Sequence, residues 1–280
     1  PSLEQRIGFA TSADGTAIAY ATAGTGPALL QGGHWLGHLE HDWVSPVFGP
    51  LLRRLSAAHT LVRYDPRGAG LSERNPGRLD VDALTDDLAA VADAARLARF
   101  PMLAVSQNVP IALNFAARHP DRVSALVLIG GFAQGSDLRG EAGHTETMVQ
   151  LIRSGWGDAD SPFMRAFATL FVPGGTSDEL SSFAETQRRA THPELAARLR
   201  RAIGGFDVTE ILPAVAAPTL VIHGARDAVH PAAQGQLIAS RVPNAEFRGR
   251  DTADHVLLPS APDWEPVVGW CERFIAENSG

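Results

Sequence analysis

Three residues of this chain have side chains that together can perform nucleophilic catalysis: Ser106, Asp227 and His255. A serine hydroxyl becomes a nucleophile when a histidine takes its proton and a carboxylate orients that histidine. The order Ser, Asp, His along the chain is one that such sets use, and each residue follows a predicted strand. Each also has an ordinary interpretation, because serine caps helices and aspartate caps loops. Asp137 is a weaker candidate for the carboxylate.

Ser106 stands at an abrupt change of pattern. Residues 102–105 form a short apolar run, and a helical pattern begins directly after the serine and extends over residues 107–118. A serine on a sharp turn from strand to helix is presented at the tip of a sheet, with the positive end of the helix behind it. The backbone N–H of Gln107 would then face the oxyanion of an acyl intermediate.

The elements that must position these residues alternate between strands and helices. After an opening hairpin, the strands are continuous apolar runs, which is typical of parallel strands covered on both faces. This alternation predicts an α/β fold with a doubly wound, mostly parallel sheet, whose active site lies outside the carboxyl ends of its strands. We expect strands at residues 6–11, 16–23, 28–30, 60–64, 102–105, 125–129, 219–222 and near 247, and helices at residues 45–57, 81–97, 107–118, 231–241 and 264–275.

The alternation stops between about residues 132 and 215. This stretch has helical patterns at residues 146–154, 163–170, 178–189 and 193–203, but no convincing buried strand. Because it interrupts the sheet at the predicted catalytic edge, we expect a helical cap over residues 132–213. Residues 1–131 and 214–280 then form the core domain. The cap aromatics Trp156, Phe163, Phe167 and Phe171 follow helical spacing, which favours packing within the cap over substrate contact.

The amino-acid composition limits the kinds of binding partner and the cellular compartment that we expect. The 280 residues carry a formal charge of −7 and contain no basic block, which argues against binding to nucleic acid or to anionic membranes. No run reaches the roughly 18 to 20 apolar residues that a membrane-spanning helix needs, and residues 1–9 do not resemble a secretory signal. Cys271 is the only cysteine, and we expect it to pack in a helix. These features favour a cytoplasmic protein.

Several segments resemble the α/β-hydrolase superfamily along the whole chain. They are LVRYDPRGAGLS at residues 61–72, AARHPDRV at 116–123, LVLIGG at 126–131 and APTLVIHG at 217–224. HLEHDW at residues 38–43, GWG at 155–157 and QRR at 187–189 are similar to a bacterial subgroup also found fused to adenylate cyclases or transcriptional regulators. The resemblance implies the α/β-hydrolase fold with a cap.

The activity that this resemblance implies is acyl transfer on a small, largely apolar ester, lactone or thioester. Ser106 would attack the carbonyl, His255 would accept its proton, and Asp227 would hold the imidazole. The backbone N–H groups of Gln107 and Gly33 would form the oxyanion hole, where each donor is typically worth about 3 kcal/mol in the transition state. No cofactor is implied.

The chain departs from the superfamily around the nucleophile. Where Gly-x-Ser-x-Gly is usual, it has Ala104-Val105-Ser106-Gln107-Asn108, followed by Val109 and Pro110. The usual His-Gly pair reads Gln31-Gly32-Gly33 here. Two alternatives to hydrolysis therefore stay open. One is a non-hydrolytic reaction such as cyclisation, rearrangement or C–C cleavage, and the other is a ligand-binding protein without turnover.

Histidines near residue 34 have two interpretations. His34, His38 and His41 could share one helical face and bind a metal, but the surrounding sequence favours His34 and Trp35 as lining of the substrate pocket. We therefore predict no metal site. The Arg67-Gly68-Ala69-Gly70 loop lacks both the phosphate-binding and the dinucleotide-binding glycine patterns, and we expect it to be structural.

Overall fold

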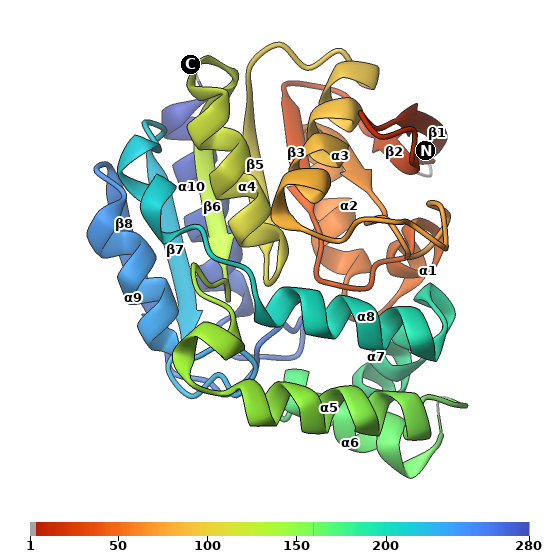
Figure 1. Ribbon diagram of the computed structural model, residues 1–280. Coiled ribbons are helices and arrows are strands. Elements are labelled where there is room, and N and C mark those ends of the chain that lie inside the picture. Colours follow the sequence, from red (N-terminus) through yellow and green to blue (C-terminus); the bar gives the residue numbers. More distant parts are fainter. Residues whose placement is uncertain (1–3, 159, 280) are drawn as a thin grey trace.

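A single sheet of eight strands organises the chain, seen in a computed structural model that describes residues 4–158 and 160–279. Residues 1–3 of the predicted core and residue 159 of the predicted cap lie outside the described residues, as does residue 280. The strand order is β1-β2-β4-β3-β5-β6-β7-β8 (Figure 1). The strands are β1 (Arg6–Thr11), β2 (Ala17–Ala23), β3 (Ala28–Gly32), β4 (Thr60–Tyr64), β5 (Phe100–Val105), β6 (Val123–Ile129), β7 (Thr219–Gly224) and β8 (Ala245–Arg250).

Strand directions confirm the predicted mostly parallel sheet. The hairpin of β1 and β2 is antiparallel, and β2 also pairs with β4 in the antiparallel sense. All other neighbours, from β4 through β3, β5, β6 and β7 to β8, are parallel. The carboxyl ends of the parallel strands therefore meet at one edge, where the residues that follow them come together.

Helices cover both faces of the sheet, and alternate strand residues face the two layers. α3 (Val81–Ala94), α4 (Asn108–Arg118) and α9 (Ala232–Arg241) pack on one face, and α2 (Gly49–Ala58) and α10 (Trp264–Asn278) pack on the other (Figure 1). Met102 faces the first layer and its neighbour Leu103 faces the second. Strands buried on both sides in this way have no polar face, which is why they are continuous apolar runs in the sequence.

Two predicted helices have different bounds in the structure, and one short helix was not predicted. The predicted helix at residues 45–57 begins only at Gly49, because the Ser45 side chain accepts a hydrogen bond from the Val47 N–H and forms a turn. A short helix, α1 (Leu39–Val44), was not predicted. The helix predicted to end at residue 97 ends at Ala94, followed by Arg96 at φ +57°. Cys271 is buried in α10, as expected.

Among the described residues between β6 and β7, four α-helices form a layer at the bottom of the view in Figure 1. They are α5 (Ala142–Gly155), α6 (Pro162–Phe171), α7 (Ser177–Ala190) and α8 (Pro193–Gly204), which confirms the four helical patterns expected there. An isolated bridge between Gln134 and Asp207 joins the two ends of this segment. Across the parts of the chain that the structure describes, no helix has the length and apolar character needed to cross a membrane.

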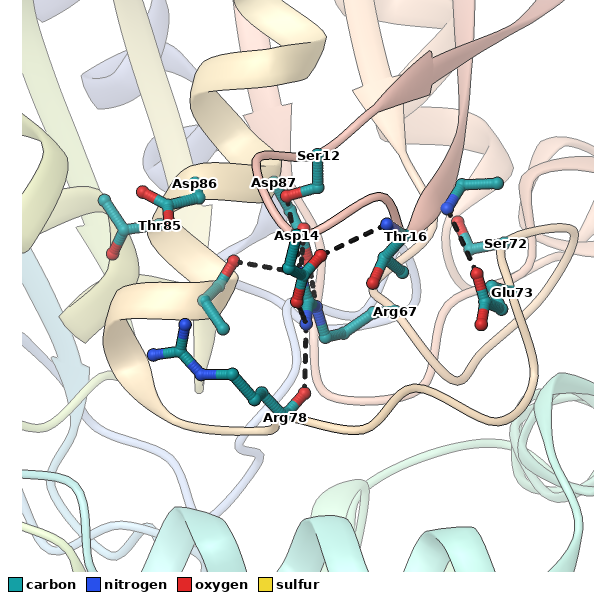
Figure 2. Close-up of polar contacts among 12 residues, drawn as sticks. Ser12, Asp14, Thr16, Arg67, Ser72, Glu73, Arg78, Thr85, Asp86 and Asp87 are labelled. Atoms are coloured by element: carbon teal, nitrogen blue, oxygen red, sulfur yellow. Dashed lines mark hydrogen bonds and ion pairs between the residues drawn. The ribbon is translucent and has the colours of Figure 1, made fainter.

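A buried arginine ties the opening hairpin to the rest of the core. The Arg67 side chain is fully buried and donates to the carboxylates of Asp14 and Asp87, at 2.7 and 2.6 Å for the closest contacts. It also donates to the Ser12 hydroxyl and to the Arg78 carbonyl, at 3.3 and 3.1 Å (Figure 2). These contacts fit the structural role expected for this loop, because a buried charge is tolerated where its donors are satisfied.

Candidate active site

Ser106 occupies the turn between β5 and α4 in a backbone conformation that serine rarely adopts. Its φ is +55°, and its N–H donates to the Ile129 carbonyl at 2.9 Å, which holds the turn against β6. The Ser106 carbonyl accepts from the Val109 N–H at 3.0 Å and starts the helix. A left-handed non-glycine residue costs about 1 to 3 kcal/mol and persists where the surrounding structure holds it, often at functional sites.

The unusual residues after Ser106 are accommodated by two glycines, one at the end of β3 and one in the loop after β6. A Cβ added to Gly32 would lie 1.6 Å from the Asn108 side-chain oxygen, and one added to Gly131 would lie 2.4 Å from the Val109 side chain. The Asn108 amide also donates to the Tyr64 hydroxyl at 2.7 Å. In the usual motif, glycines within the turn itself leave the space that the turn needs. Here Gly32 of β3 and Gly131 of the loop after β6 leave that space instead.

The three residues singled out from the sequence lie in hydrogen-bond contact. His255 Nε2 is 2.8 Å from Ser106 Oγ, and His255 Nδ1 is 2.7 Å from Asp227 Oδ2. The other Asp227 oxygen accepts the backbone N–H groups of Val229 and His230, at 2.8 and 3.1 Å. Asp227, rather than the alternative Asp137, is therefore the carboxylate that contacts His255.

Asp227 is held as a carboxylate in a buried setting. Burial alone raises the pKa of Asp227, but the positive charge of His255, its hydrogen bond and the backbone N–H of His230 lower that pKa overall. His223 lies on the other side of the carboxylate, with Nε2 3.6 Å from Asp227 Oδ2 and 2.8 Å from the His230 carbonyl. Burial lowers the pKa of His223, which favours a neutral ring that donates to that carbonyl.

A cavity, here named the Ser106 cavity, opens beside these residues. Ser106, Gln107 and Trp35 line one side of it, and the α6 residues Phe167 and Phe171 line another. Trp35 is thus part of the wall of this cavity, and its role in a substrate pocket stays a prediction. The two phenylalanines also pack on one another, with ring centroids 5.2 Å apart, so they serve both the helical layer and the cavity.

The two predicted oxyanion donors are placed differently. Gln107 lines the Ser106 cavity, and within the described residues its backbone N–H has no acceptor. Gly33 instead lines a second cavity, named the β3 cavity, together with His34, Asp42 and Arg63. Trp35 is the residue of this segment that reaches the Ser106 cavity. The role of Gly33 stays a prediction.

His34 is buried in the β3 cavity. Its ring stacks on Phe48 with centroids 4.6 Å apart, and burial lowers the pKa of His34 to about 3, which keeps the ring neutral. His38 instead caps α1. Among the residues that the structure describes, no three His, Cys, Asp or Glu side chains are grouped so that they could hold a metal ion.

The helical layer is bonded directly to the histidine loop. The His255 N–H donates to the Phe171 carbonyl at 2.8 Å, and the Gly174 N–H donates to an Asp254 carboxylate oxygen at 2.7 Å. Asp254 is thus buried and bonded to the loop after α6. This contact couples the position of α6 to that of His255.

Three residues of the site were missed from the sequence: His144, Arg200 and His230 all line the Ser106 cavity. His230 lies beside His255, with ring centroids 5.4 Å apart, and burial lowers the pKa of His230 well below its usual value. The only signal for His230 was its position three residues after Asp227 in a predicted active-site loop. Nothing in the sequence separates Arg200 from its neighbours Arg198 and Arg201.

The family of the chain follows from comparison with known proteins. Residues 35–262 match the family described as the alpha/beta hydrolase fold. Because this match covers most of the chain, the chain belongs to that family, which confirms the fold predicted from the sequence. Its relatives are named hydrolases and esterases, which makes this protein a hydrolase enzyme.

Individual relatives span nearly the whole chain. A pyrrolizixenacetamide deacetylase from Xenorhabdus hominickii is 26% identical over 231 residues, covering 82% of this chain and 85% of the relative. A pimeloyl-(acyl-carrier protein) methyl ester esterase from Xanthomonas campestris pv. campestris is 32% identical over 265 residues, covering 90% of this chain and 96% of the relative. The crystal structure of a hydrolase from Pseudomonas aeruginosa PA01 superposes with a TM-score of 0.81 at 23% identity, covering 96% and 98% of the two chains.

Proposed function

We propose that this protein hydrolyses a small, largely apolar ester, lactone or thioester through Ser106, His255 and Asp227. The observation that carries the proposal is the continuous chain of hydrogen bonds, 2.8 and 2.7 Å long, from the Ser106 hydroxyl through His255 to Asp227. The hydroxyl end of this chain faces a cavity with aromatic walls. The named activities of the deacetylase and the methyl ester esterase, which act on acyl bonds, support the same chemistry.

Each step can be assigned to a side chain. Ser106 Oγ attacks the carbonyl carbon while His255 Nε2 takes the hydroxyl proton, and Asp227 stabilises the imidazolium through Nδ1. The tetrahedral intermediate collapses, and His255 returns the proton to the departing alcohol or thiol. A water molecule then attacks the acyl-enzyme, again giving its proton to His255, and the acid leaves as Ser106 regains its hydroxyl.

The oxyanion requires two donors. The Gln107 N–H is the first, supported by its free position beside Ser106. The second comes from the segment after β3. Gly33 is the residue predicted from the sequence, but the cavity lining favours the Trp35 N–H. We also propose that residues 132–213 act as a cap that sets specificity, and that residues 1–131 and 214–280 are the catalytic core of a cytoplasmic enzyme.

Intact-mass spectrometry after incubation with a small fluorophosphonate tests the proposal. Wild type should gain one adduct, because an activated serine displaces fluoride from phosphorus, and Ser106→Ala should gain none. Ser124→Ala is the matched control, since Ser124 is a buried serine on β6 whose hydroxyl has no hydrogen-bond partner among the described residues. An unmodified wild type, with the probe shown to enter the cavity, would contradict acyl-enzyme catalysis.

Because the turn after Ser106 is unusual, two alternatives to hydrolysis, a non-hydrolytic reaction and ligand binding without turnover, are tested with the same variants. A non-hydrolytic reaction that uses only the acid–base pair predicts turnover that survives Ser106→Ala and is lost in His255→Ala. A ligand-binding protein predicts tight binding without turnover in any variant.

A further inference from the structure

A polar side pocket adjoins the Ser106 cavity. Arg200 of α8, His144 of α5 and His230 line both spaces, so the Ser106 cavity and the side pocket border one another at these residues. Arg139 and Glu141 line only the side pocket. The substrate space therefore has an aromatic part near α6 and a polar end near α8.

Among the described residues, Arg200 is the arginine of this end with no carboxylate at ion-pair distance. The hydrogen bonds of its guanidinium within that part of the chain are two long contacts, of 3.4 and 3.5 Å, to the Ser136 hydroxyl. Among the ion pairs of residues 4–158 and 160–279, none includes Arg200, whereas Arg139 is paired with Glu141 at 3.1 Å. Burial lowers the pKa of Arg200, and the nearby carboxylates of Asp137 and Glu141 do not offset this. A partly buried guanidinium in this state gains most from a new anion.

We propose that Arg200 binds a carboxylate of the substrate, so that the preferred ester, lactone or thioester carries a carboxylate at the end away from the reacting carbonyl. This inference rests on the proposed function, since it names the substrate class of the same site. One unpaired guanidinium matches a single negative charge, and its planar fork matches a carboxylate. A phosphate dianion fits less well, because Glu141 and Asp227 also line the side pocket and would repel it.

The location of Arg200 explains how an acyl chain would be oriented. Its carboxylate would lie in the side pocket, its methylene groups would pass Ile203 and Val229, and its carbonyl would lie at Ser106. The aromatic face of Phe167 and Phe171 would then receive the leaving group. The predicted apolar character of the substrate thus applies to all but one end.

A matched pair of substrates tests this assignment. The p-nitrophenyl monoesters of succinate, glutarate and adipate are compared with the corresponding terminal amides, which have the same shape without the charge. For at least one chain length, wild type should prefer the acid, by on the order of 10- to 100-fold in kcat/KM, as expected for a hydrogen bond to a charged group. Arg200→Gln should abolish this preference mainly through KM, and Arg200→Lys should keep part of it.

Arg201→Gln is the matched control, because Arg201 is the next residue of α8 but is paired with Glu146 at 2.7 Å on the outer side. It should keep the wild-type preference. Equal kcat/KM values for acid and amide at all three lengths in an active enzyme would overturn the inference while leaving the proposed function intact. Failure of every ester would instead contradict the proposed function.

Calorimetry measures binding of the carboxylate to Arg200 separately from hydrolysis of the ester. Monomethyl glutarate is titrated into Ser106→Ala, which cannot form an acyl-enzyme, and dimethyl glutarate is the neutral comparison. The monoanion should bind at least 10-fold more tightly than the diester in Ser106→Ala and in its Arg201→Gln derivative, but not in its Arg200→Gln derivative. Equal binding of the two compounds in Ser106→Ala would overturn the carboxylate assignment.

Discussion

Arg67 and Arg200 are both buried to a large degree, but the surroundings of the two guanidinium groups differ. Arg67 donates to two carboxylates, a hydroxyl and backbone carbonyls (Figure 2), whereas the hydrogen bonds of Arg200 within the described residues are two long contacts to the Ser136 hydroxyl. The pKa of Arg67 is raised, because its bonds to Asp87 and Asp14 outweigh the cost of burial, and the pKa of Arg200 is lowered. A satisfied buried cation stabilises the fold, and an unsatisfied one beside a cavity is available to a ligand.

The region around Ser106, which includes Arg200, differs from the Arg67 region in the same way: some of its polar groups are not satisfied. The Ser106 side of the sheet edge contains a strained backbone at Ser106 and buried polar atoms that have no hydrogen-bond partner in the described part of the chain, including Trp35 Nε1 and His230 Nδ1. Such atoms cost free energy in the unliganded protein and can be satisfied by a substrate or by water. The Arg67 region is expected to determine stability, and the Ser106 region is expected to determine activity.

The largest expected effect is on activity. Ser106→Ala should lower kcat for p-nitrophenyl ester hydrolysis by about 10⁴- to 10⁶-fold, and Asp227→Asn by about 10⁴-fold, because the nucleophile or the imidazole tautomer is lost. Thermal unfolding should show that Ser106→Ala keeps its Tm within a few degrees of wild type. A loss of Tm as large as that of an Arg67 variant would show that the Ser106 region also supports the fold.

The largest expected effect on stability is that of Arg67→Met. Removing one partner of a buried ion pair leaves Asp87 uncompensated, so the free energy of unfolding should fall by about 3 to 5 kcal/mol. Denaturant unfolding measures this. In the control Arg165→Met, which removes an exposed pair with Asp160, the loss should stay below about 1 kcal/mol. Equal losses in the two variants would contradict a stabilising role of the Arg67 contacts.

A smaller loss of stability is expected where a glycine accommodates the nucleophile turn. Gly131→Ala should destabilise by about 1 to 3 kcal/mol, because the new Cβ meets the Val109 side chain. The added substitution Val109→Ala should restore part of that stability, and a double-mutant cycle measures the coupling. Gly143→Ala, on the open surface of α5, is the control and should change the free energy of unfolding by less than about 1 kcal/mol. Additive effects of Gly131→Ala and Val109→Ala on the free energy of unfolding would mean that the two residues are not energetically coupled.

The smallest expected effect is that of Arg200→Gln on stability. Because burial already disfavours the charged form of Arg200, removing the charge should leave the free energy of unfolding within about 1 kcal/mol of wild type or raise it. Urea unfolding of Arg200→Gln and of Arg67→Met, each relative to wild type, would compare the two losses in the free energy of unfolding. A loss of 3 kcal/mol or more, on the order expected for a broken buried pair, would show that Arg200 has a structural role after all.

Local patterns in the sequence were enough to predict the sheet, its parallel strands and the helices that follow them. Strands buried on both faces must be apolar throughout, and helices must be amphipathic, so both leave periodic signals within a few residues. Ser106, Asp227 and His255 were found in the same way, since each follows a strand and parallel strands end at one edge. The start of the helix at Gly49 was missed because it depends on a single side-chain turn at Ser45.

Only the tertiary structure decided how the unusual turn is accommodated and what the substrate space looks like. Gly32 and Gly131 leave room for Asn108 and Val109 from other parts of the sheet, a relation between residues far apart in the sequence. Arg200 and Arg201 are adjacent in the sequence and chemically identical, yet one lines the Ser106 cavity and the other pairs with Glu146 outside. Composition and periodicity determined which elements form, whereas the packing of distant elements determined which charges are left for a ligand.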